Sequence, residues 1–300
     1  MKTLIIHHHD LDGYVAGDIA LLKYPDAETL SLGYDKPDLV PDMERLNAYA
    51  LVVIVDYCLP APLMRELCRR GTAIWIDHHV SAIRSAAEEG FDSLPGLRSD
   101  PDAPPECGAE LAWRFFLGGE PPRFVRLVGE YDTFRNSHAP IFDEEVMPFF
   151  YATQLHFDEE YLPANAASPA FRLKTAADFQ DEARCEELLR QGRLIRDYVE
   201  EHYRRATAEA AYVRQIWGCR VLCFNCHGHG SVAVKPAFDP EKHDIMLRYS
   251  YNGHKWGYGI FTDGEAKPAV DVAAIARHYG GGGHRCAAGF STDELLPELK

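Results

Sequence analysis

The sequence of 300 residues contains few cysteines and no long hydrophobic run. Its eight cysteines are too sparse for a disulfide-stabilised scaffold and fit a reducing compartment. No run approaches the roughly 18 apolar residues of a membrane-spanning helix. The segment before the first histidine has too few apolar residues for a secretory signal. These absences predict a cytoplasmic protein with no membrane partner.

Basic residues are also scarce, since 31 lysines and arginines stand against 46 aspartates and glutamates, for a net charge of −15. So acidic a surface repels long polyphosphate backbones and argues against non-specific binding of long nucleic acid. It leaves room for a small basic pocket that binds a short anionic ligand. The apolar content of 46% is ordinary for a soluble protein with a real core, and the length favours two domains.

Three short apolar runs lie in the N-terminal part of the chain, at Leu4–Ile6, Leu51–Val55 and Ala73–Ile76. Unbroken β-branched runs of this length are typical of strands buried on both faces, as in a parallel sheet. Segments of helical composition at 14–23 and 62–70 separate the runs. Alternating strands and helices predict a doubly wound α/β domain.

The middle of the chain changes character several times. Residues 91–105 are rich in Pro, Asp and Gly and predict a loop, and helices are expected at 106–117 and 122–128. Residues 136–175 show no clear period. Residues 177–216 have a strongly helical composition, which predicts a helical linker.

A different pattern follows the linker. Residues 219–224 are typical of a strand, and residues 245–251 alternate between apolar and polar side chains, as in a half-buried strand. A helix is expected at 270–279, directly before the four glycines 280–283. The sequence therefore predicts a second domain that contains both strands and helix.

Acidic and imidazole side chains follow each of the three N-terminal runs. The carboxyl ends of parallel strands meet at one edge of the sheet, where several such groups together can offset the desolvation of a divalent ion. An Asp after a strand is often only a helix N-cap, and a pair of histidines is often a surface accident. Three clusters at three strand ends favour a dinuclear metal site, and ligands without thiolate favour Mn²⁺ or Mg²⁺ over structural zinc. The candidate ligands are His8, Asp10, Asp12, Asp56, His78, His79 and Asp132.

These motifs resemble those of the DHH phosphoesterase superfamily. The resemblance lies in Asp77-His78-His79 after a strand, in His8-x-Asp10-x-Asp12-Gly13, and in Asp56 at a strand end. Tyr131-Asp132-Thr133-Phe134 fits the fourth motif of the family, and the segment 281–289 resembles the signature of the DHH-associated C-terminal domain. The resemblance implies an α/β fold in which a doubly wound parallel-sheet DHH domain is joined by a helical linker to a smaller mixed-sheet α/β domain. The implied ranges are 1–175 for the catalytic domain, 176–212 for the linker and 213–300 for the substrate-binding domain.

The same resemblance implies roles for the individual residues. His8, Asp10 and Asp56 would hold one Mn²⁺, and Asp12, Asp56, His78 and Asp132 a second, with Mg²⁺ or Co²⁺ as substitutes. Asp77 would orient the site and His79 would face the scissile phosphate, while a hydroxide activated by the two metals attacks the phosphorus. Because His7 alternates with His8, the sequence leaves open which of these two is the ligand.

The glycine run and one arginine are the candidate substrate-binding groups. Glycines after a helix let backbone amides approach a phosphate, although a glycine run can also be a flexible hinge. Arg248 lies on the polar face of its strand, where it is either a solvated residue or, by the resemblance, a ligand of a terminal phosphate. The candidates are Arg248, Gly281, Gly282, Gly283, His284 and Arg285.

One cysteine cluster lies outside the family pattern. Its members are Cys219, Cys223, Cys226, His227 and His229. Zinc takes four such ligands in a tetrahedral arrangement, but no second paired cluster follows at zinc-finger spacing. The sequence favours small buried cysteines beside a polar loop and leaves zinc binding open.

Taken together, the residues and the resemblance predict a Mn-dependent phosphoesterase, a hydrolase acting on ester bonds. The acidic charge favours short nucleotides as substrates, either nanoRNA, as for an oligoribonuclease, or linear dinucleotides. The alternatives are an exopolyphosphatase or pyrophosphatase, a cyclic dinucleotide phosphodiesterase, and a non-catalytic nucleotide-binding module. The polarity of cleavage is left open, as is the formation of a homodimer.

Overall fold

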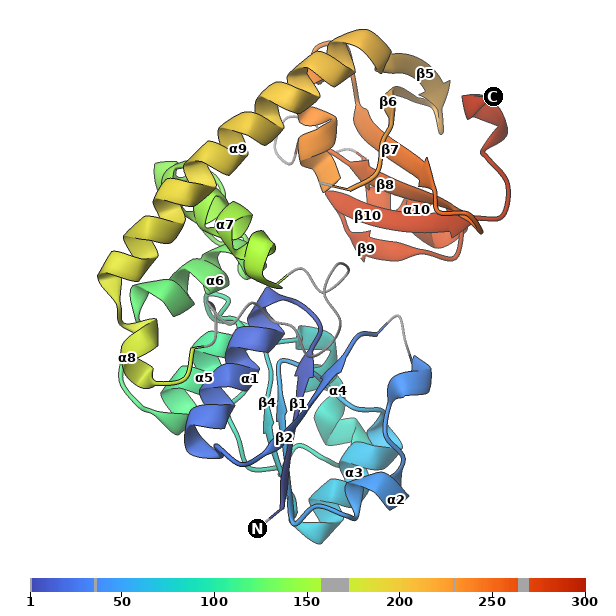
Figure 1. The fold of residues 1–300 in the computed structure, drawn as a ribbon. Helices are drawn as coiled ribbons and strands as arrows, with labels where there is room; N and C mark the ends of the chain where they lie inside the picture. Colours follow the sequence, from blue (N-terminus) through green and yellow to red (C-terminus); the bar gives the residue numbers. More distant parts are fainter. Residues whose placement is uncertain (1, 35–36, 158–172, 229, 264–269) are drawn as a thin grey trace. The chain divides into compact units, whose positions relative to one another are not determined.

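A computed structural model describes the chain apart from residues 1, 35–36, 158–172, 229 and 264–269 (Figure 1). The chain divides into two compact units, Met1–Ile195 and Arg196–Lys300. None of the described helices is both long and apolar enough to span a membrane. Each unit is built around its own sheet.

The first unit contains a sheet of four parallel strands. They are β1 (Thr3–His8), β2 (Glu28–Leu32), β3 (Leu51–Val55) and β4 (Ala73–Ile76), in the order β2-β1-β3-β4. Three of them coincide with the predicted apolar runs. The sequence does not reveal β2, because as an edge strand it is mostly accessible and has no unbroken apolar run.

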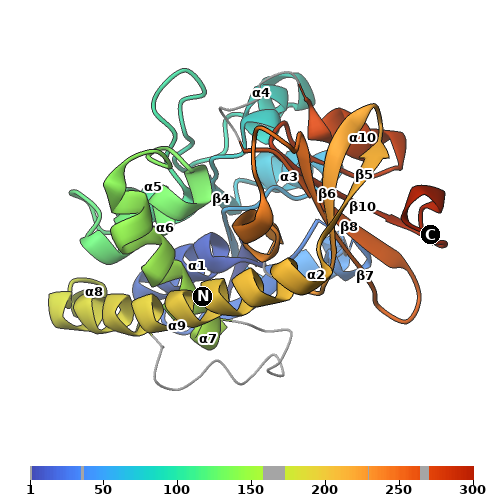
Figure 2. The same ribbon diagram turned by 90° about the horizontal axis from the view of Figure 1, so that it is seen from above.

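Helices cover both faces of this sheet (Figure 1, Figure 2). Alternate strand residues point to opposite faces, so that Ile5 and Val53 join one core cluster while Leu4 and Val52 join the other. This arrangement confirms the predicted doubly wound domain. Its helices are α1 (Leu11–Lys23), α2 (Met43–Leu46), α3 (Ala61–Arg70), α4 (Val80–Glu89), α5 (Gly108–Phe116), α6 (Arg123–Thr133), α7 (Met147–Phe157) and α8 (Ala176–Phe179).

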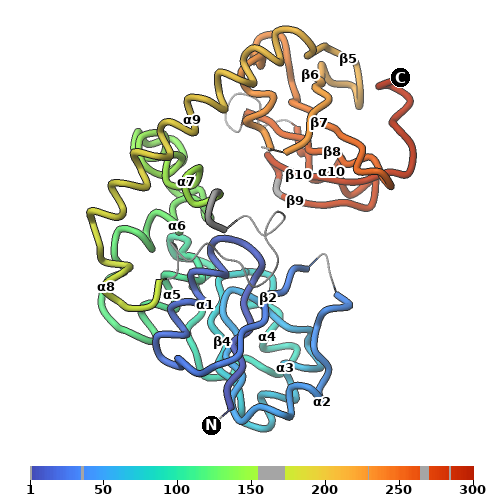
Figure 3. The backbone as a smooth tube through the Cα atoms, in the orientation of Figure 1, coloured from blue at the N-terminus to red at the C-terminus, as the bar shows by residue number. Residues whose placement is uncertain are grey.

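The predicted linker contains the longest helix, α9 (Glu182–Ala210), which runs without a break (Figure 3). The end of the predicted helical stretch 177–216 is wrong, because Tyr212–Ile216 forms strand β5. The segment reads as helical in composition, but β5 pairs in full with β6 (Cys219–Asn225), and this pairing overrides local preference. The division between the two units falls inside α9.

The second unit contains a mixed sheet of six strands. β6 and β7 (Ile245–Tyr251) pair in parallel, and the other neighbours are antiparallel, which confirms the predicted mixed sheet. Helix α10 (Val272–His278) contributes Val272 and Ala276 to the core of this unit. The strand order is β5-β6-β7-β8-β10-β9, with β8 at Trp256–Phe261, β9 at Gly282–His284 and β10 at Ala287–Thr292.

Replacing Gly192 by alanine tests the packing of α9 within the first unit. A Cβ at this position would overlap the backbone carbonyl of Pro148 at the start of α7. We expect Gly192→Ala to lower the free energy of unfolding by about 1–3 kcal/mol, although alanine is the better helix former. Thermal denaturation measures this, with Arg190→Ala at an exposed position of α9 as the control. An unchanged or raised melting temperature for Gly192→Ala would contradict the packing.

Candidate metal centre

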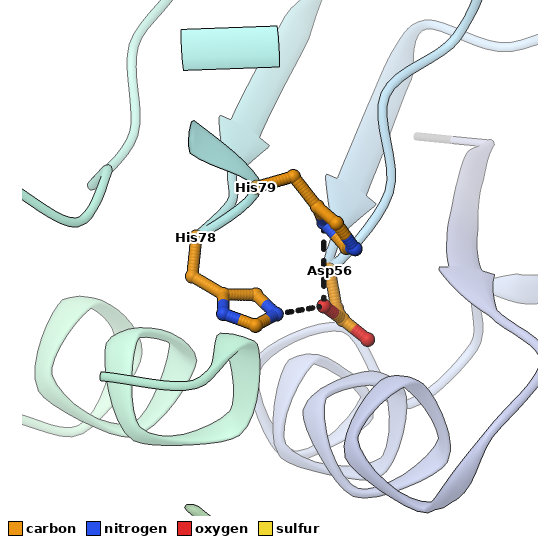
Figure 4. A group of neighbouring side chains, drawn as sticks. All are labelled: Asp56, His78 and His79. Carbon is orange, nitrogen blue, oxygen red and sulfur yellow. Dashed lines mark ion pairs between the residues drawn. The ribbon is translucent and has the colours of Figure 1, made fainter. Parts of the chain in front are cut away.

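Asp56 lies at the centre of the predicted ligands (Figure 4). It follows β3 with a left-handed backbone (φ 52°), which is uncommon for a residue other than glycine, and its side chain is about 1% exposed. Neither carboxylate oxygen has a hydrogen-bond partner among the described residues. The N-cap interpretation does not apply to Asp56, because α3 begins after Pro60 without a side-chain cap.

The loop after β1 contributes His8 and Asp10. Nδ1 of His8 lies 2.6 Å from Oδ2 of Asp10 and 3.9 Å from Oδ2 of Asp56. Oδ1 of Asp10 accepts a hydrogen bond from the backbone N–H of Gly13 and so caps α1. Nδ1 of His7 lies 2.8 Å from the carbonyl oxygen of His8, and its ring packs beside Tyr14. His8, and not His7, therefore faces the cluster.

The loop after β4 is organised by the fully buried Asp77. Oδ1 of Asp77 accepts hydrogen bonds from the backbone N–H groups of His78 and His79 and lies 2.7 Å from Nδ1 of His79. Its Oδ2 accepts a hydrogen bond from the indole N–H of Trp75. These bonds direct His78 toward Asp56, with Nε2 of His78 3.1 Å from Oδ1 (Figure 4).

Asp12 is held by the first turn of α5. Its two oxygens accept hydrogen bonds of 2.7 Å each from the backbone N–H groups of Gly108 and Ala109. A helix N-terminus stabilises a carboxylate in this way. A Cβ on Gly108 would lie 2.5 Å from Cβ of Asp56, so glycine permits α5 to approach both aspartates. Sequence reasoning missed this role, because no local pattern links Asp12 to a segment nearly a hundred residues away.

Asp132 belongs to α6 and is positioned by a salt bridge that the sequence analysis also missed. Arg135 donates two hydrogen bonds of 2.7 Å to the buried carboxylate of Glu110 on α5, and one of 2.9 Å to Glu130 on α6. This arginine ties together the two helices that hold Asp12 and Asp132. In the sequence, the one indication of this salt bridge is that Arg135 follows Asp132 by three residues.

Three overlapping groups of these side chains could hold metal ions, because in each the ligand atoms lie within 4.8 Å of one another. Asp56 belongs to two of the groups and so does His78, as expected for ligands near adjacent ions. The buried oxygens of Asp56 accept no hydrogen bond from the described residues, and such a carboxylate is costly unless a cation compensates its charge. The groups are Asp56, His78 and His79; His8, Asp10 and Asp56; and Asp12, His78 and Asp132. The donor set therefore fits a divalent metal.

The electrostatics of the cluster agree with this fit. Burial, together with the charges of Asp12 and Asp10, raises the pKa of Asp56 well above its usual value. Burial and the same two neighbours raise the pKa of Asp132 to about 8. Without a cation, the carboxylates therefore repel one another at neutral pH.

The candidate substrate-binding residues lie in the second unit. Arg248 is on β7, and its buried Nε has no hydrogen-bond partner among the described residues. Gly282, Gly283 and His284 form β9, so two of the four glycines lie in an edge strand that pairs with β10. Arg285 is exposed in the turn that follows, and a Cβ on Gly281 would overlap the backbone of Gly289. The glycines permit close packing of backbone against backbone here.

Among the described residues, the groups suited to a metal all lie in the first unit. Cys223 is buried within β6, and burial raises the pKa of its thiol to about 12. Burial raises the pKa of Cys226 to about 11. His229 lies outside the described residues. Zinc binding at this cluster stays an open alternative.

Comparison with known proteins supports the fold. No protein-family model and no curated protein sequence matches the chain. A pGpG-specific phosphodiesterase, PggH from Vibrio cholerae, matches 98% of this chain and 94% of its own with a TM-score of 0.55 at 12% identity. RecJ from Thermus thermophilus in complex with Mn²⁺ matches 97% of this chain and 49% of its own (TM-score 0.48, 20% identity). An exopolyphosphatase-related protein from Bacteroides fragilis matches 99% and 88% (TM-score 0.46, 12% identity).

Only the first of these matches exceeds a TM-score of 0.5, and at 12% identity it indicates a shared fold alone. Together with the His/Asp cluster, it confirms the predicted resemblance to the DHH phosphoesterases. The chain thus has a DHH-type two-domain α/β fold and a cluster suited to divalent metal.

The crowded carboxylates predict how the stability of the metal-free protein depends on pH. A carboxyl whose pKa is raised by folding stabilises the protein below its unfolded pKa, and this contribution is lost as the pH rises through the folded pKa. For Asp132 this interval runs from 3.8 to about 8. We therefore expect the melting temperature to fall between about pH 5 and pH 8, and to fall several degrees less in Asp132→Asn.

Calorimetry in the presence of a chelator measures this difference. The exposed Asp26→Asn serves as the control and should follow the wild type. Parallel curves for Asp132→Asn and the wild type would contradict the electrostatic description of the cluster.

Proposed function

We propose that this chain is a Mn-dependent phosphoesterase that hydrolyses short nucleotides, either nanoRNA or linear dinucleotides. The observation that carries the proposal is the buried Asp56 carboxylate, whose two oxygens have no hydrogen-bond partner among the described residues. A purely structural aspartate at this depth would have its oxygens satisfied by backbone or side-chain donors. Oδ2 of Asp56 instead faces the imidazole of His8, and its Oδ1 faces that of His78.

Asp56 is proposed to bridge two metal ions. His8 and Asp10 would complete one site, and Asp12, His78 and Asp132 the other. Divalent ions bound there supply Lewis acidity for phosphoryl transfer and make water acidic enough to attack near neutral pH. The protein holds the ligands ready for this: Asp12 is fixed by the amides of α5, and α6 is tied to α5 through Arg135.

His79, oriented by Asp77, is proposed to act on the substrate phosphate. Because Nδ1 of His79 is engaged by Asp77, its Nε2 is the nitrogen left to face a substrate. Burial alone would lower the pKa of His79, but the hydrogen bond and the charge of Asp77 raise it above its usual value. A protonated His79 can donate a hydrogen bond to a phosphoryl oxygen or to the leaving oxygen.

The choice of short nucleotides rests on charge and on the second unit. The net charge of −15 disfavours long strands, whereas one arginine suffices for a terminal phosphate. The buried Nε of Arg248 has no hydrogen-bond partner among the described residues, and such an unsatisfied donor supports a role for this arginine in binding an anionic ligand. The structurally similar PggH is named as specific for pGpG, a linear dinucleotide.

The direct test is release of mononucleotide from pApA and pGpG by the Mn²⁺-loaded protein, with Asp56→Asn as the matched inactive variant. We expect release by the wild type and a loss of about a hundredfold or more in the variant, because the shared ligand has lost its charge. Tripolyphosphate and a cyclic dinucleotide are assayed alongside. If the protein hydrolyses tripolyphosphate or the cyclic dinucleotide but neither pApA nor pGpG, the hydrolysed compound replaces the proposed substrate class. If it hydrolyses none of the four compounds, a non-catalytic binding role is favoured.

A second prediction concerns the proton on His79. In Asp77→Asn the neutral amide keeps the shape of the loop but removes the charge that raises the pKa of His79. We expect kcat to fall by about 10- to 100-fold, and the alkaline limb of the pH–rate profile to move to lower pH. The exposed Asp92→Asn should leave the profile unchanged. A lowered rate with an unshifted alkaline limb would show that His79 does not act in its protonated form.

A further inference from the structure

We propose that Tyr34 forms a stacking site for a nucleobase beside the metal centre. This inference rests on the proposed function and specifies its substrate class. Tyr34 comes two residues after β2, at the carboxyl-end edge of the sheet where β1, β3 and β4 deliver their ligands. The segment after the edge strand β2 thus provides an aromatic side chain. The segments after β1, β3 and β4 provide carboxylates and imidazoles at the same edge of the sheet.

Contacts fix the Tyr34 ring from two directions. It stacks on Tyr57, with ring centroids 4.6 Å apart and an interplanar angle of 24°. Its hydroxyl oxygen accepts a hydrogen bond of 3.2 Å from the backbone N–H of Cys58. Tyr57 and Cys58 directly follow Asp56, so the same loop anchors both the central carboxylate and the ring. A ring held in this way loses little conformational freedom when a ligand stacks on it.

The ring also lies close to a proposed metal ligand, His8, and to the histidine proposed to act on the phosphate, His79. Its centroid is 5.3 Å from that of His8 and 5.8 Å from that of His79. A nucleotide whose phosphate lies against His79 therefore has an aromatic side chain close by, on which its base can stack.

Exposure distinguishes Tyr34 from its neighbour. Tyr34 is 51% exposed, whereas Tyr57 is only 2% exposed beneath it. An anchored aromatic ring that is half exposed can bind planar, aromatic ligands, and every nucleobase has an aromatic face that can stack on it. Inorganic polyphosphate and pyrophosphate have no group that could use it. The ring therefore favours a nucleotide over the phosphate-chain alternatives.

Equilibrium binding tests this site without requiring catalysis. The dissociation constants of AMP and of the base-free ribose 5-phosphate are measured by calorimetry with the Mn²⁺-loaded protein. We expect the wild type to prefer AMP by about tenfold to a hundredfold, the range found for stacking of one base. Tyr34→Ala should reduce this preference severalfold, while Tyr34→Phe, which keeps the ring, should retain most of it.

Tyr34→Leu is the second variant, because leucine keeps an apolar contact with Tyr57 but offers no aromatic face. A loss of preference in both Ala and Leu variants, at unchanged affinity for ribose 5-phosphate, supports the proposal. A wild-type preference near one, or an equal preference in all variants, would overturn it. Hydrolysis of pApA is measured in a separate assay. The binding result can therefore overturn the stacking site without affecting the proposed phosphoesterase activity, and a lack of hydrolysis does not change the binding result.

Discussion

The burial of the Asp56 carboxylate without a hydrogen-bond partner among the described residues is the constraint on which the rest of the site depends. The backbone of Asp56 is left-handed, and the approach of α5 to its side chain requires a glycine at position 108. A strained backbone of this kind is typical of functional sites. A charge in this position is stable only when a cation is present. The surrounding side chains are arranged accordingly: those that face Asp56 are imidazoles and carboxylates, the ligand types of a divalent ion.

The ligands differ in how the protein holds them. Asp12 is fixed by two amides of α5, and Asp10 caps α1, so each already has donors of its own. Asp56 has no such donors among the described residues and is left for the metal. Asp77 takes the opposite role, since it accepts hydrogen bonds from several donors and belongs to none of the three candidate metal groups. Asp77 thus stabilises the loop after β4, whereas Asp56 is the carboxylate suited to contact a metal.

Much of this architecture could be predicted from the sequence, because strands β1, β3 and β4 are buried on both faces and leave unbroken apolar runs. The edge strand β2 leaves no such run, and β5 lies in a stretch of helical composition, although it pairs in full with β6. The candidate ligands other than Asp132 could be found because they follow strand ends, whereas Asp132 lies on α6 and is indicated by the resemblance to the family. The contacts of Arg135 with Glu110, and of Asp12 with α5, join segments that are distant in the chain, and no local pattern encodes them. Fold similarity does not supply the substrate, and the groups proposed to select it are Tyr34 and Arg248.

The number of metal ions bound per chain tests the central claim most directly. The metal-free protein is titrated with Mn²⁺, and bound ions are counted by equilibrium dialysis while paramagnetic resonance reports whether they are coupled. A carboxylate shared by two sites predicts two ions per chain with the spectrum of a magnetically coupled pair. A single isolated ion, or none, in a folded protein would contradict a dinuclear centre built around Asp56.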